Sequence, residues 1–212
     1  MKIAVWHNLP SGGGKRALYN HVKALKERGH YIEAWTTDFA TQQYLPLSEL
    51  IIEHQLPIKK QILRARKIKS PTKRIKKNVE ILKNHARQCV NDIEARDIEL
   101  IFANSCMFTH MPFVGLFANI PVIVYLGEPF RKFYEASTNE NIWQLPDYGH
   151  GIKKLSRFYR DYCKILSYRF QVREEVNAAK AFSRILVNSL YSRESVIRAY
   201  GIDACVCYLG ID

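Results

Sequence analysis

The chain has 212 residues, 47% of them hydrophobic and 25% charged, which is enough length to bury a core and an ordinary globular composition. Its five cysteines form no CxxC pair, which indicates reduced thiols in a cytoplasmic protein and excludes the usual spacing of a zinc site. The formal net charge of +12 is concentrated in one basic segment, Lys59–Lys77, which contains ten Lys or Arg residues and no acid.

The first half of the chain alternates between strand-like and helix-like patterns. Short apolar runs rich in β-branched and aromatic residues predict strands, and apolar residues three or four positions apart predict amphipathic helices. Gly29 suits the left-handed position after a helix. The elements expected here are a strand at Lys2–His7, a helix from Gly13 or Gly14 to Gly29, a strand at Tyr31–Thr37, an ambiguous region at 41–57 that includes the strand-like Leu50–Pro57, and a helix at Ile75–Ile93.

The second half begins with Leu100–Gly127, which contains no charged residue and therefore raises the question of a membrane-spanning helix. Asn104, Pro112, Asn119 and Pro121 divide this stretch into pieces of strand length, so we expect a buried strand–helix–strand unit. The elements expected here are a strand at Leu100–Asn104, a helix near Phe108–Phe117, a strand at Val122–Leu126, an irregular segment at Gly127–Gly151, a helical stretch at Ile152–Phe182 with room for one break, a strand at Arg184–Ser189, a helix that Ser192 caps and Gly201 ends, and a strand at Ala204–Gly210.

Strands that alternate with helices predict βαβ units, and hence an α/β fold with a mostly parallel sheet. In such sheets ligands bind at the carboxyl ends of the strands. Four segments are expected to meet there: the glycine loop Gly12–Gly14, and the residues that follow Asn104, Leu126 and Val187.

The glycine loop does not match two familiar nucleotide-binding motifs. It lacks the P-loop pattern GxxxxGK[ST], because Leu9 replaces the first glycine and Arg16 replaces the Ser or Thr. It fits the dinucleotide fingerprint GxGxxA, but Asn8–Ser11 separate it from the strand, so an NAD(P)-dependent Rossmann enzyme stays open as an alternative. Bare backbone N–H groups at the start of a helix attract an anion, and Lys15 and Arg16 add positive charge at the same end.

Two stretches at opposite ends of the chain resemble glycosyltransferase family 4. "SGGGKRALYNHVKALKERGHYIEAWT" is similar to the family's opening unit of glycine loop, helix and second strand. "ILVNSLYSRESVIRAYGIDACVCYLGID" is similar to the end of its N-terminal domain, and the region between matches only as a pattern of elements. The resemblance implies the GT-B arrangement, in which two Rossmann-like domains with doubly wound sheets face one cleft. It identifies residues 1–212 as a single N-terminal, acceptor-side domain.

The same resemblance implies an activity for the whole enzyme. It would transfer a sugar of the hexose type from a nucleotide-sugar donor to a glycan or lipid-linked acceptor, with retention of configuration, as part of polysaccharide biosynthesis. The C-terminal domain, which binds most of the donor, is expected to be absent from this chain, so the chain alone is expected to be inactive. The nucleotide-sugar is a substrate, and no cofactor or metal is expected.

The resemblance also implies roles for individual residues. Glu128 lies near the position where the family often has a His after the fifth strand, and it is the candidate catalytic residue. The expected contacts to the donor phosphates or the transferred sugar are Gly12, Gly13, Gly14 and Lys15. The expected acceptor contacts are Arg131, Asn104 and His110.

The basic segment indicates an anionic partner or a solvated face. Because many members of the family use lipid-linked acceptors, we expect a peripheral contact with the cytoplasmic membrane face, in which Ile62, Leu63, Ile68 and Ile75 interleave with the charges as in a helix that lies on the surface. A basic nucleic-acid-binding protein is the alternative, but no RNP, zinc or helix–turn–helix signature supports it, so no nucleic acid is expected. The cationic residues are Lys59, Lys60, Arg64, Arg66, Lys67, Lys69, Lys73, Arg74, Lys76 and Lys77.

Overall fold

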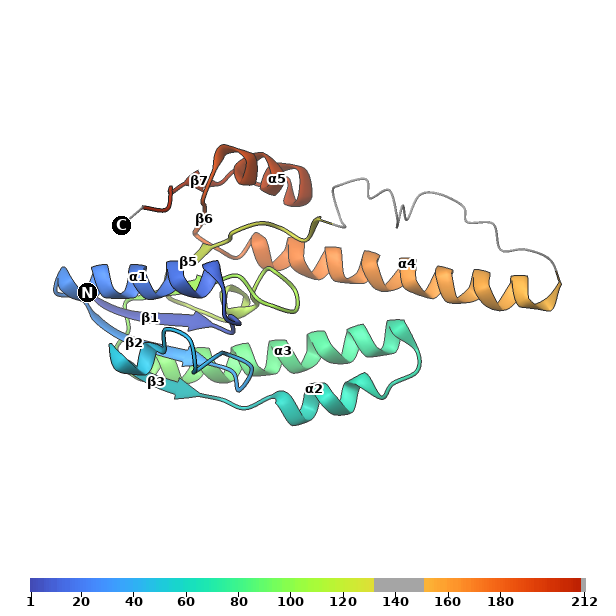
Figure 1. Ribbon diagram of the computed structural model, residues 1–212, viewed down its shortest axis with the longest axis horizontal. Coiled ribbons are helices and arrows are strands. Elements are labelled where there is room, and N and C mark those ends of the chain that lie inside the picture. The colour runs from blue at the N-terminus through green and yellow to red at the C-terminus, as the bar shows by residue number, and fades with distance from the viewer. Residues whose placement is uncertain (132–150, 211–212) are drawn as a thin grey trace.

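The computed structural model, which describes residues 1–131 and 151–210, has a parallel sheet as its central layer (Figure 1). Within the described residues the sheet has seven strands in the order β3-β2-β1-β4-β5-β6-β7, and every neighbouring pair is parallel. The prediction of an α/β fold with a Rossmann-like parallel sheet is confirmed. The direction of winding reverses between β1 and β4. These two strands lie side by side in the sheet, although 92 residues, including β2 and β3, separate the end of β1 at His7 from the start of β4 at Leu100.

The strands follow the expected order. The strands are β1 (Lys2–His7), β2 (Tyr31–Thr36), β3 (Ile52–Gln55), β4 (Leu100–Asn104), β5 (Val122–Tyr125), β6 (Arg184–Val187) and β7 (Cys205–Val206). The α-helices are α1 (Gly13–Glu27), α2 (Lys59–Arg66), α3 (Pro71–Glu94), α4 (Ile152–Ala179) and α5 (Leu190–Tyr200), and the 3-10 helices are η1 (Leu47–Glu49) and η2 (Val114–Leu116).

Strand β1 is buried on both faces, because successive side chains of a strand point to opposite sides. Ile3 and Val5 pack with Leu18 and Val22 of α1 in one core cluster. Ala4 and Trp6 belong to the other core cluster, to which α2, α3, α4 and α5 all contribute buried residues. An apolar run without alternation, such as "IAVW", therefore identifies a strand covered on both sides.

The expected helix near Phe108–Phe117 is wrong. Cys106 and His110 form an isolated antiparallel bridge, and His110 has a φ of 51°, which breaks any helix at that point. Pro112 has no N–H to continue helical hydrogen bonding, so only the short η2 forms. The segment is apolar because it packs beneath α3 and α4, where Met111 and Phe113 are buried.

Several element boundaries differ from the prediction for local reasons. Helix α3 begins at Pro71, where proline suits the first helical position and the Ser70 hydroxyl accepts a hydrogen bond from the Lys73 amide. Ser189, and not Ser192, caps α5. Helix α4 is continuous, and the last strand is limited to Cys205–Val206. Of the expected irregular segment at Gly127–Gly151, residues 132–150 lie outside the described residues.

The basic segment is not a helix that lies on the surface. It forms α2, a turn and the first turns of α3, and Ile62 is buried in the core with 1% of its surface exposed. Ile68 and Ile75 are partly buried as well, and Leu63 is exposed. The apolar side chains between the charges thus mainly stabilise this fold. In the residues that the structure describes, no helix is both long enough and apolar enough to cross a membrane.

Candidate functional site

The candidate site lies at the carboxyl ends of β1 and β4, because the sheet changes its direction of winding between these two strands. At such a switch point the loops that leave neighbouring strands run to opposite faces and open a crevice. The four segments predicted to meet at this edge do leave adjacent strands: β1, β4, β5 and β6.

The glycine loop leaves the start of α1 open to solvent. Gly12 has a φ of 144° and a ψ of −172°, a conformation that side chains strongly disfavour, and it occupies the N-cap position without a side-chain cap. All three glycines are exposed, and a Cβ added at Gly12 or Gly13 would meet no atom within 4 Å. The first amides of a helix have no partner within the helix, so these N–H groups point from a positive helix end into open space.

Lys15 does not extend the positive surface of this loop. Its side chain is fully buried beneath the loop, and burial lowers the pKa of its ammonium group, an effect that the carboxylate of Glu53 on β3 opposes. Glu53 in turn lies 3.7 Å from Nε2 of the buried His7 on β1. Among the described residues, Nζ of Lys15 has no hydrogen-bond partner. Lys15 therefore contributes charge from behind the loop, whereas Arg16 is exposed and donates to the Tyr44 hydroxyl.

Asn8 joins the β1 loop to the β4 loop. Its side-chain oxygen accepts a hydrogen bond of 2.9 Å from the Met107 amide, and its side-chain nitrogen lies 3.2 Å from Sγ of Cys106. Asn8 is fully buried, so this connection is part of the fold rather than of a solvated surface. Asn104, the last residue of β4, is also buried, with 3% of its surface exposed. The expected acceptor contact at Asn104 thus lies below the protein surface at this edge of the sheet.

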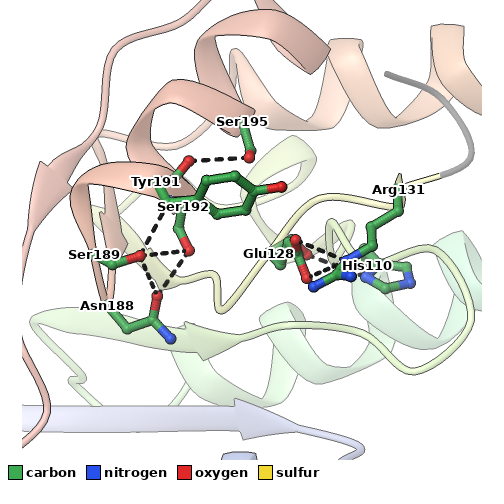
Figure 2. A network of polar contacts seen from close by, with 8 residues as sticks. All are labelled: His110, Glu128, Arg131, Asn188, Ser189, Tyr191, Ser192 and Ser195. Atoms are coloured by element: carbon green, nitrogen blue, oxygen red, sulfur yellow. Dashed lines mark hydrogen bonds and ion pairs between the residues drawn. The ribbon is translucent and has the colours of Figure 1, made fainter. Parts of the chain in front are cut away.

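Glu128, Arg131 and His110 are brought together after β4 and β5 (Figure 2). Nε of Arg131 donates to both carboxylate oxygens of Glu128 at 2.9 Å. Nδ1 of His110 lies 3.2 Å from the backbone carbonyl of Glu128, and its ring packs on Phe130 with centroids 5.0 Å apart. Burial lowers the pKa of His110, so the neutral ring donates from Nδ1 and leaves a lone pair on Nε2.

The loop after β6 adds hydroxyl and amide groups beside this cluster, as Figure 2 shows. Ser192 donates through Oγ to the side-chain oxygen of Asn188 at 2.8 Å, and the Ser189 hydroxyl accepts from the Ser192 amide at 3.1 Å. These bonds hold the start of α5, where the ring of Tyr191 is 54% exposed.

Sequence reasoning located the edge of the sheet but missed several residues of the site. The roles of Asn8 and Glu53 depend on contacts between segments far apart in sequence, although an Asn directly after the first strand was a signal for Asn8. His110, Glu128 and Arg131 were predicted one by one, and the structure shows that they form one cluster. Among the described residues, no group of three or more His, Cys, Asp or Glu residues is arranged to bind a metal ion.

The chain is similar to known proteins in sequence pattern and in fold. The model of the family described as Glycosyltransferase Family 4 matches residues 11–212. No curated protein matches. A solved structure of a ugt transferase from Siraitia grosvenorii in complex with UDP is similar at 14% identity and a TM-score of 0.49, over 99% of this chain and 51% of that chain. Arabidopsis thaliana UGT89C1 complexed with UDP is similar at 13% identity and a TM-score of 0.46, over 99% of this chain and 48% of that chain. The chain thus spans about half the length of these solved structures.

Proposed function

The chain belongs to Glycosyltransferase Family 4, and on that basis we propose that it is the acceptor-side domain of a retaining glycosyltransferase. The enzyme transfers a hexose-type sugar from a nucleotide-sugar donor to a glycan or lipid-linked acceptor during polysaccharide biosynthesis. A second Rossmann-like domain supplies most of the donor site, and this chain alone does not turn over substrate.

The observation that carries this proposal is the open glycine loop at the switch point of the sheet. Its uncapped amides are exposed, and no side chain covers Gly12 or Gly13. Such a group of N–H donors suits the phosphates of the donor or the leaving diphosphate, whose charge increases during transfer. Lys15 stabilises negative charge there only over a distance, because its ammonium group is buried.

The acceptor binds beside the cluster of Glu128, Arg131 and His110 in this proposal. Glu128 accepts a hydrogen bond from the acceptor hydroxyl after Arg131 turns towards an acceptor phosphate. Their pairing does not prevent this, since exposed ion pairs contribute little stability, and the Arg131 side chain is 64% exposed. Nε2 of His110 offers an additional acceptor atom for a sugar hydroxyl. Catalysis then depends on holding donor and acceptor in the reactive geometry.

A transfer assay tests the proposed function. We expect sugar transfer from nucleotide-sugar donors when the chain is combined with a donor-binding domain of its family, and none from the chain alone. Mass spectrometry of the acceptor measures the product, and a reaction without acceptor controls for donor hydrolysis. Transfer by the chain alone would contradict the acceptor-side role. Enhanced fluorescence of a reduced nicotinamide cofactor on addition of the chain would instead favour the dinucleotide-dependent alternative.

We further propose that the enzyme acts on the cytoplasmic face of a membrane that contains anionic lipid. All ten cationic side chains between Lys59 and Lys77 are exposed, and in the described residues the one ion pair among them joins Lys77 to Glu80. Basic residues close to such a surface contribute about 1 kcal/mol each, and salt screens the attraction. Because Ile62 is buried and Ile68 and Ile75 are partly buried, this contact is electrostatic and not an insertion of the segment into the bilayer.

Reversing two charges of the basic segment is expected to weaken membrane binding. Lys67→Glu with Lys69→Glu, in the turn between α2 and α3, should reduce partitioning onto anionic vesicles roughly tenfold or more. Vesicle flotation at low and high salt measures this. The control, Lys23→Glu with Lys180→Glu, makes the same change in net charge on exposed residues of α1 and at the end of α4. Equal losses in both variants, or binding unaffected by salt and lipid charge, would refute the proposed contact.

A further inference from the structure

Helices α3 and α4 lie side by side and extend past the ends of the strands (Figure 1). A groove of about 670 Å³ runs between the first turns of α3 and residues 157–171 of α4. That volume is typical of sites for small molecules. The residues that line it belong to none of the four segments at the carboxyl edge of the sheet.

The groove is strongly cationic. Arg74 of α3 lines one wall, and Arg157, Arg160 and Lys164 line the other, with Asp161 as the single acid among the lining residues. The three cations of α4 are three and four positions apart, so they share one face of that helix. The four positive side chains repel one another, Asp161 offsets only part of their charge, and an anion that binds between them relieves the remaining repulsion.

Hydrogen bonds between the two helices fix the shape of the groove. The Thr72 hydroxyl on α3 donates to the Cys163 carbonyl on α4 at 3.1 Å. The Ser167 hydroxyl, which donates to the same carbonyl within α4 at 2.7 Å, lies 3.4 Å from the Thr72 hydroxyl oxygen of α3. Ser167 and Gln171, both buried, form a polar floor. The cationic side chains are therefore presented by a preformed cradle.

Asn78 adds a requirement beyond charge. It lines the groove, and its side-chain oxygen is buried without a hydrogen-bond partner among the described residues. A buried acceptor without a donor is unfavourable by about 1–3 kcal/mol. A deprotonated phosphate oxygen cannot donate to it, but a hydroxyl group can.

We infer that this groove binds the phosphate ester of a polyol. The phosphate lies among the Arg and Lys side chains, where guanidinium groups form paired, charge-assisted hydrogen bonds, and a hydroxyl of the polyol donates to Asn78. A soluble polyol phosphate and the glycerol phosphate headgroup of an anionic lipid share this chemistry. The inference goes beyond the proposed function, because it assigns a separate anion site on the helices and does not depend on sugar transfer.

Titration of the chain with sn-glycerol 3-phosphate, followed by NMR, tests the site. We expect saturable shifts at the groove, and Arg160→Glu should weaken binding at least roughly tenfold, as the loss of one charge-assisted bond implies. The matched control, Arg169→Glu, makes the same change on an exposed residue of α4 outside the groove. Equal weakening in both variants, or no binding by the unaltered chain, would overturn the inference.

A second variant separates hydroxyl recognition from charge. Asn78→Ala should weaken sn-glycerol 3-phosphate roughly tenfold and leave sulfate unchanged, because the polyol presents a hydroxyl donor to the Asn78 oxygen and sulfate has no hydrogen to donate. Equal effects on both probes would overturn the role of the hydroxyl.

Vesicles distinguish the two sources of the ligand. Phosphatidylcholine vesicles with and without phosphatidylglycerol are compared, using the same Arg160→Glu and Arg169→Glu variants. A loss of binding to the anionic vesicles that is larger for Arg160→Glu supports the lipid headgroup. Saturable binding of sn-glycerol 3-phosphate, together with equal vesicle binding by Arg160→Glu and Arg169→Glu, supports a soluble polyol phosphate. Transfer activity that persists in Arg160→Glu with a soluble acceptor would leave the proposed function intact even if the groove binds neither probe.

Discussion

Replacing Gly13 with leucine is expected to reduce kcat/KM for sugar transfer by the assembled enzyme at least about 100-fold, the scale of losing a group that stabilises developing negative charge. The side chain would project from the glycine loop into the space that the donor phosphates need. The free energy of unfolding should change little, since a Cβ at Gly13 meets no atom within 4 Å and its φ is not in the left-handed region.

The control for this experiment is Asn20→Leu. Asn20 is exposed on the same helix, two turns after the loop, so the two variants add a similar apolar side chain to α1. Transfer kinetics and urea unfolding are measured for both. Unchanged kcat/KM in Gly13→Leu would remove the loop from the site, and a large loss of stability would show that the glycine is needed for folding instead.

Replacing Glu175 with glutamine is expected to stabilise the chain at neutral pH. Glu175 is fully buried between α4 and α5, where its carboxyl group accepts hydrogen bonds from Gln171 at 2.8 Å and Tyr200 at 3.0 Å. Burial is the main cause that raises the pKa of Glu175 to about 8, and the two hydrogen bonds oppose it only in part. Glutamine has nearly the same shape, can hydrogen-bond to both neighbours and never has to be buried as a charge.

The effect of Glu175→Gln should depend on pH in one direction. Between a pKa near 4.5 in the unfolded chain and about 8 in the folded chain, only the folded form keeps the proton. The free energy of unfolding therefore falls as the pH rises through this range. The variant does not titrate, so its advantage should be absent below pH 4.5, reach roughly 3 kcal/mol at pH 7 and level off above pH 8.

Urea unfolding from pH 4 to pH 9 measures this dependence. The control is Glu194→Gln, which removes an exposed carboxylate that pairs with Arg198 on α5. Its stability should stay within about 0.5 kcal/mol of the unaltered chain at each pH. An advantage of Glu175→Gln that is constant across the pH range would contradict the raised pKa.

The sequence by itself determined the order of the strands, most of the helices and the edge of the sheet where the site lies. These features follow from local patterns: the apolar run of β1, the helical spacing in α1, and glycines with positive φ at Gly29 and Gly201, where helices end. The expected helix at Phe108–Phe117 failed because an apolar stretch that packs beneath other elements is buried whatever its backbone conformation, so its composition could not distinguish helix from loop.

Only the tertiary structure decided how polar residues are used. Lys15 and Glu175 look like ordinary charged positions of helices, yet packing against distant segments buries both and shifts the pKa of each. The groove between α3 and α4 likewise requires Arg74 and Arg160 to face each other although they are far apart in sequence. Burial and long-range contacts set the electrostatic energy of a side chain, and neither can be read from its immediate neighbours in the chain.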